Sequence, residues 1–580
     1  MSVQAYLRKE WGPFRGLYKD VIGSVVPSPY AITATDCLLD NDVLEVMTGD
    51  AIYNTGITSA SSASHTYLIN FTKEDNSSAT ADHIYYCNGT IWRDVTASTS
   101  NAIGHTVGTA TITNGSTTVS GFSTTWNTGT EVQAGDYIKR KVDADSAYQI
   151  ISSVNSDTSI TLTANWSGTT LTNGAYIIRK QFTGSDTAVA TAITFKGGIV
   201  ITNGTEPMQY FSPDDINQGS MNIITSAPLA KCLEIHKSRC FAANTTSLPH
   251  DLFWSPSNAP SSAWNASATG SIYPQDGGGE IVAVKSYNSR LFVFKRYGGY
   301  IYEIRGDFPT TIGAYDSIVP INTKHIGILL GKTVVEFQGL LWFVTSQGLY
   351  YFDGSEIKLA NRGLENFIAS NGSLFTTKAN SHRVFSTVFK NRMIINLVTS
   401  FAVVDKYFNI TLQTHPDSSN PYMGSFAISK VGDGVTPLLY VPQGTNLVNF
   451  NGAYLRTNND DTTPNVNNTF VYETGEDYLD SPEYNKDFYK FYVVAEETSG
   501  TQTILFAYDI DKTGTYVSNT LTLTGTASKI QVFEVPVRPV GNITTNSRGR
   551  CIRWRIKGNN TTLNFRVIKV ILRYGLTSLR

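Results

Sequence analysis

The chain has 580 residues, of which 47 are Gly, 12% are aromatic and 16% are charged, a composition that favours many short strands joined by turns and argues against disorder. The 45 Lys and Arg residues nearly balance the 47 Asp and Glu residues, so the chain lacks the basic balance that is typical of tight nucleic-acid binding. Five cysteines without CxxC spacing predict neither a disulfide framework nor a zinc site, and they favour a reducing compartment.

Residues 1–60 are expected to form an extended lead-in. Pro27 and Pro29 disfavour a helix, and Val43–Val46 is a strand candidate. The first ten residues lack the apolar core of a signal peptide, and no apolar run of about 18 residues follows. We therefore expect a chain that is neither classically secreted nor membrane-spanning.

A short apolar strand, a polar turn with Gly, an aromatic strand and a further Gly recur along the chain. This motif is clearest in Leu291–Gly306 and Leu341–Gly354, and related motifs begin near Cys240, Met393 and Leu438. The starts are about 50 residues apart, a period typical of β-propellers. We predict an all-β fold in which residues 61–101 and 181–457 form a propeller of six or seven blades, closed by the lead-in.

Residues 102–180 interrupt this period and are dense in Thr, Ser and Gly. Without these residues, the motifs at Tyr67 and Ile199 would be one blade apart. Residues 102–180 are therefore predicted to form a small, inserted, barrel-like β domain. Tyr148–Val154 and Ser159–Thr163 alternate around a turn and predict a hairpin.

Three aromatic residues of the insertion, Trp126, Tyr148 and Trp166, are candidates for its core. The alternative is that they form a surface that docks a partner. The residues alone leave both readings open.

The polar tract 458–464 is a plausible linker to a third region, residues 458–580, where several strands have alternating faces. Their density predicts a C-terminal antiparallel β-sandwich. The strand candidates are Phe488–Val494, Thr503–Tyr508, Ile530–Val535, Cys551–Ile556 and Leu563–Ile568.

A search for catalytic motifs finds only partial matches. Gly331-Lys332-Thr333 lacks the upstream Gly of a phosphate loop and precedes a strand. Asp509–Gly514 resembles the start of a calcium loop, but its spacing favours a hairpin turn. Gly277–Glu280 is expected to be a surface loop whose neighbour, Asp276, lacks an evident carboxylate partner. We expect no catalytic, cofactor-binding or metal-binding residues, and a protein that is not an enzyme.

Several segments resemble, in order, the tail nozzle proteins of short-tailed bacteriophages (podoviruses), of the tail tubular protein B type. They cover the lead-in, the blades, a Gly-hydrophobic-Tyr-x-Phe-Asp-Gly turn and the sandwich. The segments are Pro29–Gly49, Leu252–Pro256, Gly279–Val284, Leu291–Lys295, Gly348–Gly354, Tyr472–Thr474 and Lys486–Phe491.

The resemblance implies a structural part of the virion tail that is assembled in the host cytoplasm. It implies a hexameric ring below the adaptor (head-to-tail connector) ring, a channel that conducts DNA at ejection without binding it specifically, docking of tail fibres or tailspikes, and contact of the tip with the host surface. The alternative is a carbohydrate-active or receptor-binding β-propeller of a phage tail, which would need a pair of carboxylates in a pocket.

Overall fold

The computed structural model of the chain describes most of its strands. It describes residues 7–12, 14, 31–35, 37–40, 43–46, 51–55, 67–72, 82–96, 101–128, 132–144, 147–180, 182, 190–212, 220–259, 261–265, 267–297, 299–306, 308, 317–360, 364, 368, 375, 384–397, 400–414, 424–430, 437–443, 446–450, 470–497, 502–511, 513–524, 529–538, 547–558 and 565–577.

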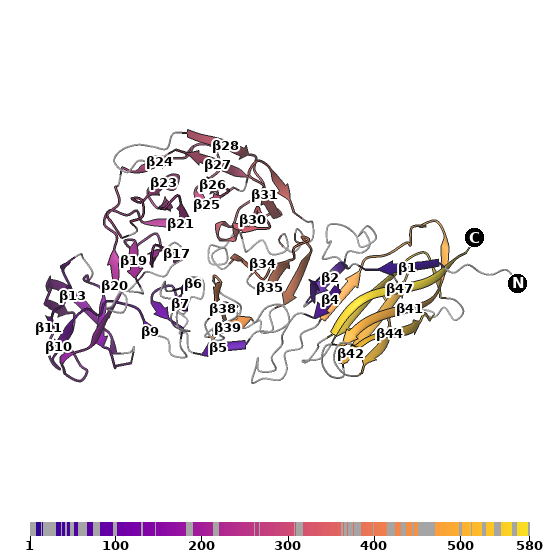
Figure 1. The fold of residues 1–580 in the computed structure, drawn as a ribbon, viewed down its shortest axis with the longest axis horizontal. Coiled ribbons are helices and arrows are strands. Elements are labelled where there is room, and N and C mark those ends of the chain that lie inside the picture. The colour runs from indigo at the N-terminus through magenta and orange to yellow at the C-terminus, as the bar shows by residue number, and fades with distance from the viewer. Residues whose placement is uncertain are drawn as a thin grey trace.

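Seven antiparallel units of four strands follow one another around a ring (Figure 1). The first four are β6 (Tyr67–Thr72), β7 (Asp82–Cys87), β8 (Trp92–Asp94) and β9 (Asn101–Ala102); β17 (Thr191–Phe195), β18 (Gly198–Thr202), β19 (Gln209–Ser212) and β20 (Ser220–Ile223); β21 (Ala230–His236), β22 (Arg239–Thr245), β23 (Asp251–Trp254) and β24 (Thr269–Ser271); and β25 (Ile281–Tyr287), β26 (Arg290–Lys295), β27 (Tyr300–Arg305) and β28 (Ser317–Thr323).

The last three units complete a β-propeller, which confirms the predicted fold class. They are β29 (Val335–Phe337), β30 (Leu340–Thr345), β31 (Gly348–Phe352) and β32 (Ile357–Leu359), preceded by the 3-10 turn η5 (Gly331–Thr333); β33 (Ser386–Phe389), β34 (Arg392–Asn396), β35 (Ser400–Val404) and β36 (Ile410–Thr414); and β37 (Ala427–Ser429), β38 (Leu438–Gln443) and β39 (Asn446–Phe450), with β5 (Ala51–Thr55) at the edge.

The ring closes because β5, from the lead-in, pairs antiparallel with β39 of the seventh blade. The innermost strand β6 contacts both β17 and β37, so the first blade touches the second and the last. Leu68 and Tyr86 of the first blade pack with Tyr440 and Leu447 of the seventh. Each such fully buried apolar side chain stabilises the fold by about 1.5–3 kcal/mol, so the blades are held by the apolar layers between them.

The turn between the first two strands of a blade has the same form in five blades. Both central residues have positive φ, as in Lys237 (43°) and Ser238 (61°) of the third blade. This is the type I′ conformation, whose twist matches paired strands. The other four turns are Lys196-Gly197, Asn288-Ser289, Gln338-Gly339 and Lys390-Asn391.

The insertion is a seven-stranded, nearly closed antiparallel sheet that lies between β9 and β17 in the chain. Its strand order is β15-β10-β11-β14-β13-β12-β16, and its two edge strands follow each other in sequence. The pairing of β13 with β14 confirms the predicted hairpin. The strands are β10 (Thr109–Ile112), β11 (Thr118–Phe122), β12 (Tyr137–Arg140), β13 (Gln149–Ser156), β14 (Ser159–Leu162), β15 (Leu171–Gly174) and β16 (Tyr176–Arg179).

Strands from both chain ends build the C-terminal β-sandwich. One sheet contains β1 (Leu7–Trp11), β3 (Cys37–Asp40), β4 (Val43–Val46), β41 (Asn485–Glu497), β44 (Lys529–Pro536), β45 (Arg548–Gly549) and β47 (Phe565–Thr577). The other contains β2 (Ala31–Thr35), β40 (Phe470–Thr474), β42 (Gln502–Ile510), β43 (Val517–Leu523) and β46 (Ile552–Gly558), and it continues into the sixth blade through the parallel pair β2 and β36.

The lead-in therefore differs from the expectation that residues 1–60 only close the propeller. Strands β1 to β4 join the sandwich sheets, and only β5 closes the ring. The reason is the burial of Trp11 and Phe14, whose rings lie 6.0 Å and 6.1 Å from Trp554 in the sandwich core. Large aromatic side chains are stabilised more by burial in this core than by exposure to solvent in an extended lead-in.

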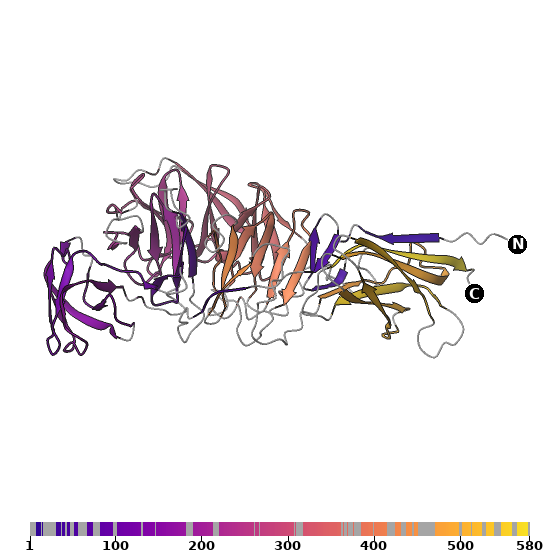
Figure 2. The ribbon, with the colours of Figure 1, turned by 60° about the horizontal axis from the view of Figure 1, so that its bottom comes forward.

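Figures 1 and 2 show the insertion, the propeller and the sandwich in a row, with both chain termini at the sandwich end. The residue boundaries 102–180 and 458–580 stay predictions, as residues 181 and 451–469 lie outside the described part.

Candidate functional site

Two of the three aromatic residues considered for partner docking lie in the core of the insertion. Trp126 and Trp166 are 0% and 1% exposed, and the Trp126 indole donates a hydrogen bond of 2.9 Å to the Tyr176 hydroxyl. Buried indoles cannot contact a partner, so the docking alternative is corrected for these two residues. Tyr148 is half-buried, with the guanidinium of Arg179 4.0 Å from its ring centre.

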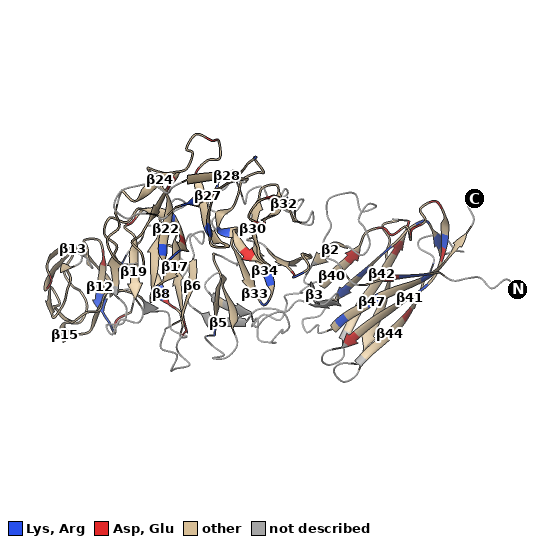
Figure 3. Ribbon diagram, turned by 45° about the horizontal axis from the view of Figure 1, so that its top comes forward, with Lys and Arg blue, Asp and Glu red and all other residues tan. Residues whose placement is uncertain are grey.

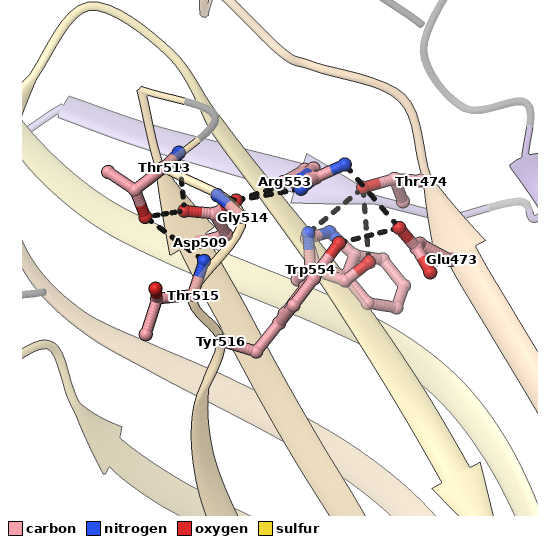
Figure 4. Close-up of polar contacts among 9 residues, drawn as sticks. All are labelled: Glu473, Thr474, Asp509, Thr513, Gly514, Thr515, Tyr516, Arg553 and Trp554. Atoms are coloured by element: carbon pink, nitrogen blue, oxygen red, sulfur yellow. Dashed lines mark hydrogen bonds and ion pairs between the residues drawn. The ribbon is translucent and has the colours of Figure 1, made fainter.

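Asp509, at the end of β42, starts the hairpin turn to β43 and is fully buried (Figure 4). One carboxylate oxygen accepts hydrogen bonds from the backbone N–H and hydroxyl of Thr513, at 3.1 Å and 2.6 Å. The other accepts the N–H of Gly514 and the guanidinium of Arg553, at 3.1 Å and 2.8 Å. The carboxylate thus holds the turn and pairs with an arginine, in agreement with the predicted hairpin.

The same arginine connects three strands of the sheet. Its guanidinium lies 3.7 Å from Glu473 of β40 and 4.9 Å from the ring centre of Tyr516, whose hydroxyl donates a 2.5 Å hydrogen bond to Glu473 (Figure 4). Burial, followed by the hydrogen bond to Glu473, raises the pKa of Tyr516. Each charged group of this network has a partner, so none of these charges is left buried and unsatisfied.

Asp276 also has partners that the sequence did not reveal. Its carboxylate accepts hydrogen bonds from the Lys295 ammonium at 2.7 Å, the Tyr302 hydroxyl, and the N–H of Gly278 at 2.7 Å. Burial works to raise the pKa of Asp276, but the hydrogen bonds from Lys295 and Tyr302 outweigh it, so the pKa is lowered. A Cβ on Gly278 would lie 2.8 Å from Lys295 Cδ, so this glycine lets the loop cover the buried lysine. The cluster is closed and satisfied.

The partial phosphate-loop match, Gly331-Lys332-Thr333, forms η5 between the fourth and fifth blades. A Cβ on Gly331 would lie 2.0 Å from the carbonyl oxygen of Val282 in β25, so only glycine fits. The Thr333 hydroxyl donates to Leu330 O at 2.6 Å and accepts the N–H of Val344 at 2.9 Å. These two residues fix the backbone on either side of Lys332.

Lys332 reaches towards blades that are not its neighbours. Its ammonium donates a hydrogen bond to the hydroxyl of Thr191, on the innermost strand of the second blade. It also lies 5.5 Å from the ring centre of Tyr67, on the innermost strand of the first blade. The Tyr67 ring in turn lies 6.0 Å from Phe385, just before the sixth blade. Side chains from separate blades therefore meet at the propeller axis.

Two further charged residues line the innermost strands. Lys285 of β25 donates a 3.2 Å hydrogen bond to Glu234 of β21, forming an ion pair. We call Tyr67, Thr191, Glu234, Lys285 and Lys332 the axial cluster; together they carry two cations and one carboxylate. No catalytic motif marks these residues, and the only sequence signal was the mismatched Gly-Lys-Thr.

The surroundings shift the titration of the axial cluster and its neighbour Cys232. Burial, and then the charge of Lys285, lowers the pKa of Lys332 to about 8, although Cys232 opposes this. Burial raises the pKa of Tyr67 to about 12 and that of Cys232 to about 11. Lys332 and Tyr67 are nevertheless partly exposed to solvent, so the cluster is enclosed by blades and still touches water.

Charge elsewhere is interspersed. Figure 3 shows Lys and Arg, and Asp and Glu, as scattered positions on a mostly uncharged ribbon, without a broad region of one sign. Among the described residues, His, Cys, Asp and Glu do not gather in threes that could hold a metal ion. Nor does that part of the chain contain a helix with the length and hydropathy of a membrane span.

No protein family and no curated protein matches the sequence. Among solved structures, a streptogramin B lyase is 10% identical, covers 67% of this chain and 99% of its own, and has a TM-score of 0.31. Virginiamycin B lyase from Staphylococcus aureus is 12% identical over 45% of this chain and 78% of its own, with a TM-score of 0.30. An exo-beta-1,3-galactanase from Phanerochaete chrysosporium is 8% identical over 66% of this chain and 95% of its own, with a TM-score of 0.23.

These matches correct the expectation that the chain is not an enzyme. Solved structures that match it include a lyase and a galactanase. The lack of familiar catalytic motifs in a propeller therefore does not show that the protein lacks catalytic activity. At identities and TM-scores this low, the likeness assigns no reaction, substrate or partner to this chain.

Proposed function

We propose that this protein is a structural component of a bacteriophage short tail. Copies of it form the ring-shaped nozzle below the adaptor ring, conduct genomic DNA during ejection and support tail fibres or tailspikes. The order of the described units carries the proposal: a closed propeller has an inserted β domain at one end and, at the other, a sandwich built from both chain termini (Figure 2). This order agrees with the resemblance of the sequence to tail nozzle proteins.

The DNA channel of this proposal lies between copies of the chain. Tyr67 and Phe385, from blades that are not adjacent, approach within 6.0 Å at the axis, whereas the major groove of DNA alone is about 12 Å wide. A duplex cannot follow that axis. A ring of copies joined by heterologous contacts leaves a central channel instead, and a net charge of −2 limits the phosphate contacts that would hold DNA in place.

The test is labelling electron microscopy of phage particles that contain the protein. An antibody against the insertion, residues 102–180, is expected to mark the side of the short tail. A control antibody against a capsid protein marks the head. Label on the head alone, or on no part of the particle, would contradict the proposal.

A second candidate is a carbohydrate-active or receptor-binding propeller of a phage tail, and the axial cluster, which contains one carboxylate and not a pair, favours binding over cleavage. Polar side chains on a propeller axis, partly open to solvent, are suited to holding a small ligand. Incubation of the full chain with host polysaccharide separates the candidates: turnover or saturable binding supports this one, and the absence of both would contradict it.

A further inference from the structure

We propose that the axial cluster binds an oxyanion, the carboxylate or phosphate group of a small ligand, and that Lys332 is its cationic contact. This site goes beyond the proposed structural role and does not depend on it. The inference rests on four features of the cluster: an ammonium without a counter-charge or further hydrogen-bond acceptors among the described residues, several donors on that ammonium, a rigid backbone and contact with solvent.

Lys332 is the cation of the cluster that has no carboxylate partner among the described residues. Glu234 is already bound to Lys285, at 3.2 Å. Among the described residues, no carboxylate lies within ion-pair distance of Lys332, and its recorded contacts are the Thr191 hydroxyl and the Tyr67 ring. A buried or half-buried charge without a partner is costly, and an anion that binds there offsets that cost.

The hydrogen-bonding capacity of the cluster also fits an anion. An ammonium has three N–H donors, and Thr191 accepts only one of them. The Thr191 hydroxyl donates its own hydrogen to the carbonyl of Lys231 at 3.1 Å, so it orients the ammonium. The Tyr67 hydroxyl donates to Ala192 O at 3.0 Å and, as a neutral group, supplies no counter-charge. Charge-assisted hydrogen bonds to an oxyanion would use the remaining donors.

The position of Lys332 is set before any ligand arrives. Gly331 packs against the Val282 carbonyl, and Thr333 is tied to Leu330 and Val344. A fixed backbone lowers the ordering cost of binding. Lys332 and Tyr67 are partly exposed, so the cluster is in contact with solvent.

The experiment titrates the full-length protein at pH 7 with sodium phosphate and, separately, sodium acetate, against sodium chloride at equal ionic strength, and records the thermal midpoint. The variants are Lys332→Met, Thr191→Val and the control Lys324→Met, which removes an exposed lysine outside the cluster. A ligand that binds the native state raises the midpoint in a saturable way.

We expect one or both oxyanions to raise the midpoint of the wild type and of the Lys324→Met control. The Lys332→Met variant should bind at least tenfold more weakly, and Thr191→Val should show an intermediate loss. A response to phosphate alone indicates a phosphate ligand, and a response to acetate alone indicates a carboxylate ligand. Absence of a saturable rise with either salt, or an equal rise in Lys332→Met, would overturn the proposal.

A second measurement does not depend on the folding of a variant. An amine-reactive acylating reagent at pH 8 modifies Lys332 in the wild type, and mass spectrometry of the peptides follows the yield. We expect phosphate or acetate to slow this modification at least threefold relative to chloride, while Lys324 reacts at an unchanged rate. Equal yields at Lys332 in all three salts would count against the site.

Discussion

Lys332 donates a hydrogen bond to the hydroxyl of Thr191, a residue 141 positions earlier in the chain and on a different blade of the propeller. This contact crosses the axis of the ring, where a hydrogen bond holds an ammonium that lacks a carboxylate partner among the described residues. The surroundings that set the pKa of Lys332 therefore form only when the blades close into a ring.

The glycine before this lysine is required by close packing. We predict that Gly331→Ala destabilises the protein by about 3 kcal/mol, because its Cβ would lie 2.0 Å from the Val282 carbonyl and displace β25. The control is Gly339→Ala, where a Cβ meets open space but φ is 71°, at a cost of about 1 kcal/mol. Chemical denaturation compares the two, and a smaller loss for Gly331→Ala than for Gly339→Ala would contradict this packing.

The pKa of Lys332 predicts a rise of stability with pH. It falls from 10.5 to about 8 on folding, so between these values the unfolded chain binds more protons, and raising the pH favours the folded state. Relative to Lys332→Met, the wild type should gain about 2 kcal/mol between pH 8 and pH 10. Denaturation at each pH measures the difference.

The variant comparison isolates Lys332 from its neighbours. Cys232 and Tyr67 have raised pKa values and destabilise the fold at alkaline pH, but they are present in both proteins, as are Lys285 and Glu234. A free-energy difference that stays constant from pH 8 to pH 10 would show that burial does not perturb Lys332.

His236 predicts a loss of stability in acid. Burial, and then the charge of Lys237, lowers its pKa from 6.5 to about 4, while the ring forms a 2.8 Å hydrogen bond with Ser286. Between pH 6.5 and pH 4 the unfolded chain takes up the proton first, so the folded state loses up to about 3 kcal/mol. His236→Gln should flatten this part of the pH profile; an unchanged slope would assign the acid sensitivity to other groups.

The insertion should be removable as a unit. Its core of Trp126, Trp166 and neighbouring apolar residues is separate from the apolar layers between blades, whereas Ile103 and Phe182 pack with the first two blades. Replacing residues 104–180 with a short Gly/Ser bridge should leave the propeller folded, with a thermal midpoint within a few degrees of the wild type, and impair fibre attachment or assembly. Loss of all folded protein would show that the insertion is part of the ring.

The sequence predicted the propeller because the apolar side chains that pack between blades recur once per blade. Phe294 and Phe343, one blade apart, pack 5.8 Å from each other in the layer between the fourth and fifth blades. The type I′ turns were not predicted, since Lys237-Ser238 and Lys390-Asn391 lack the Asn-Gly signature. Their positive φ values follow from the pairing of the flanking strands.

Local sequence patterns could not predict which strands pair when the strands lie far apart in the chain. Leu7 of β1 pairs with Tyr574 of β47, and no periodicity in the lead-in distinguishes this partner from a blade strand. The axial cluster was missed for the same reason: Lys332 and Thr191 approach each other only through the closure of the ring. The Asp509 hairpin, in contrast, is local and was predicted correctly.

Native mass measurement combined with electron microscopy of the protein released from phage tails tests the proposed nozzle most directly. We expect a sixfold ring of full-length chains, with the insertions at its periphery and a central channel wide enough for duplex DNA. Single chains, with no ring either free or attached to the adaptor, would contradict it.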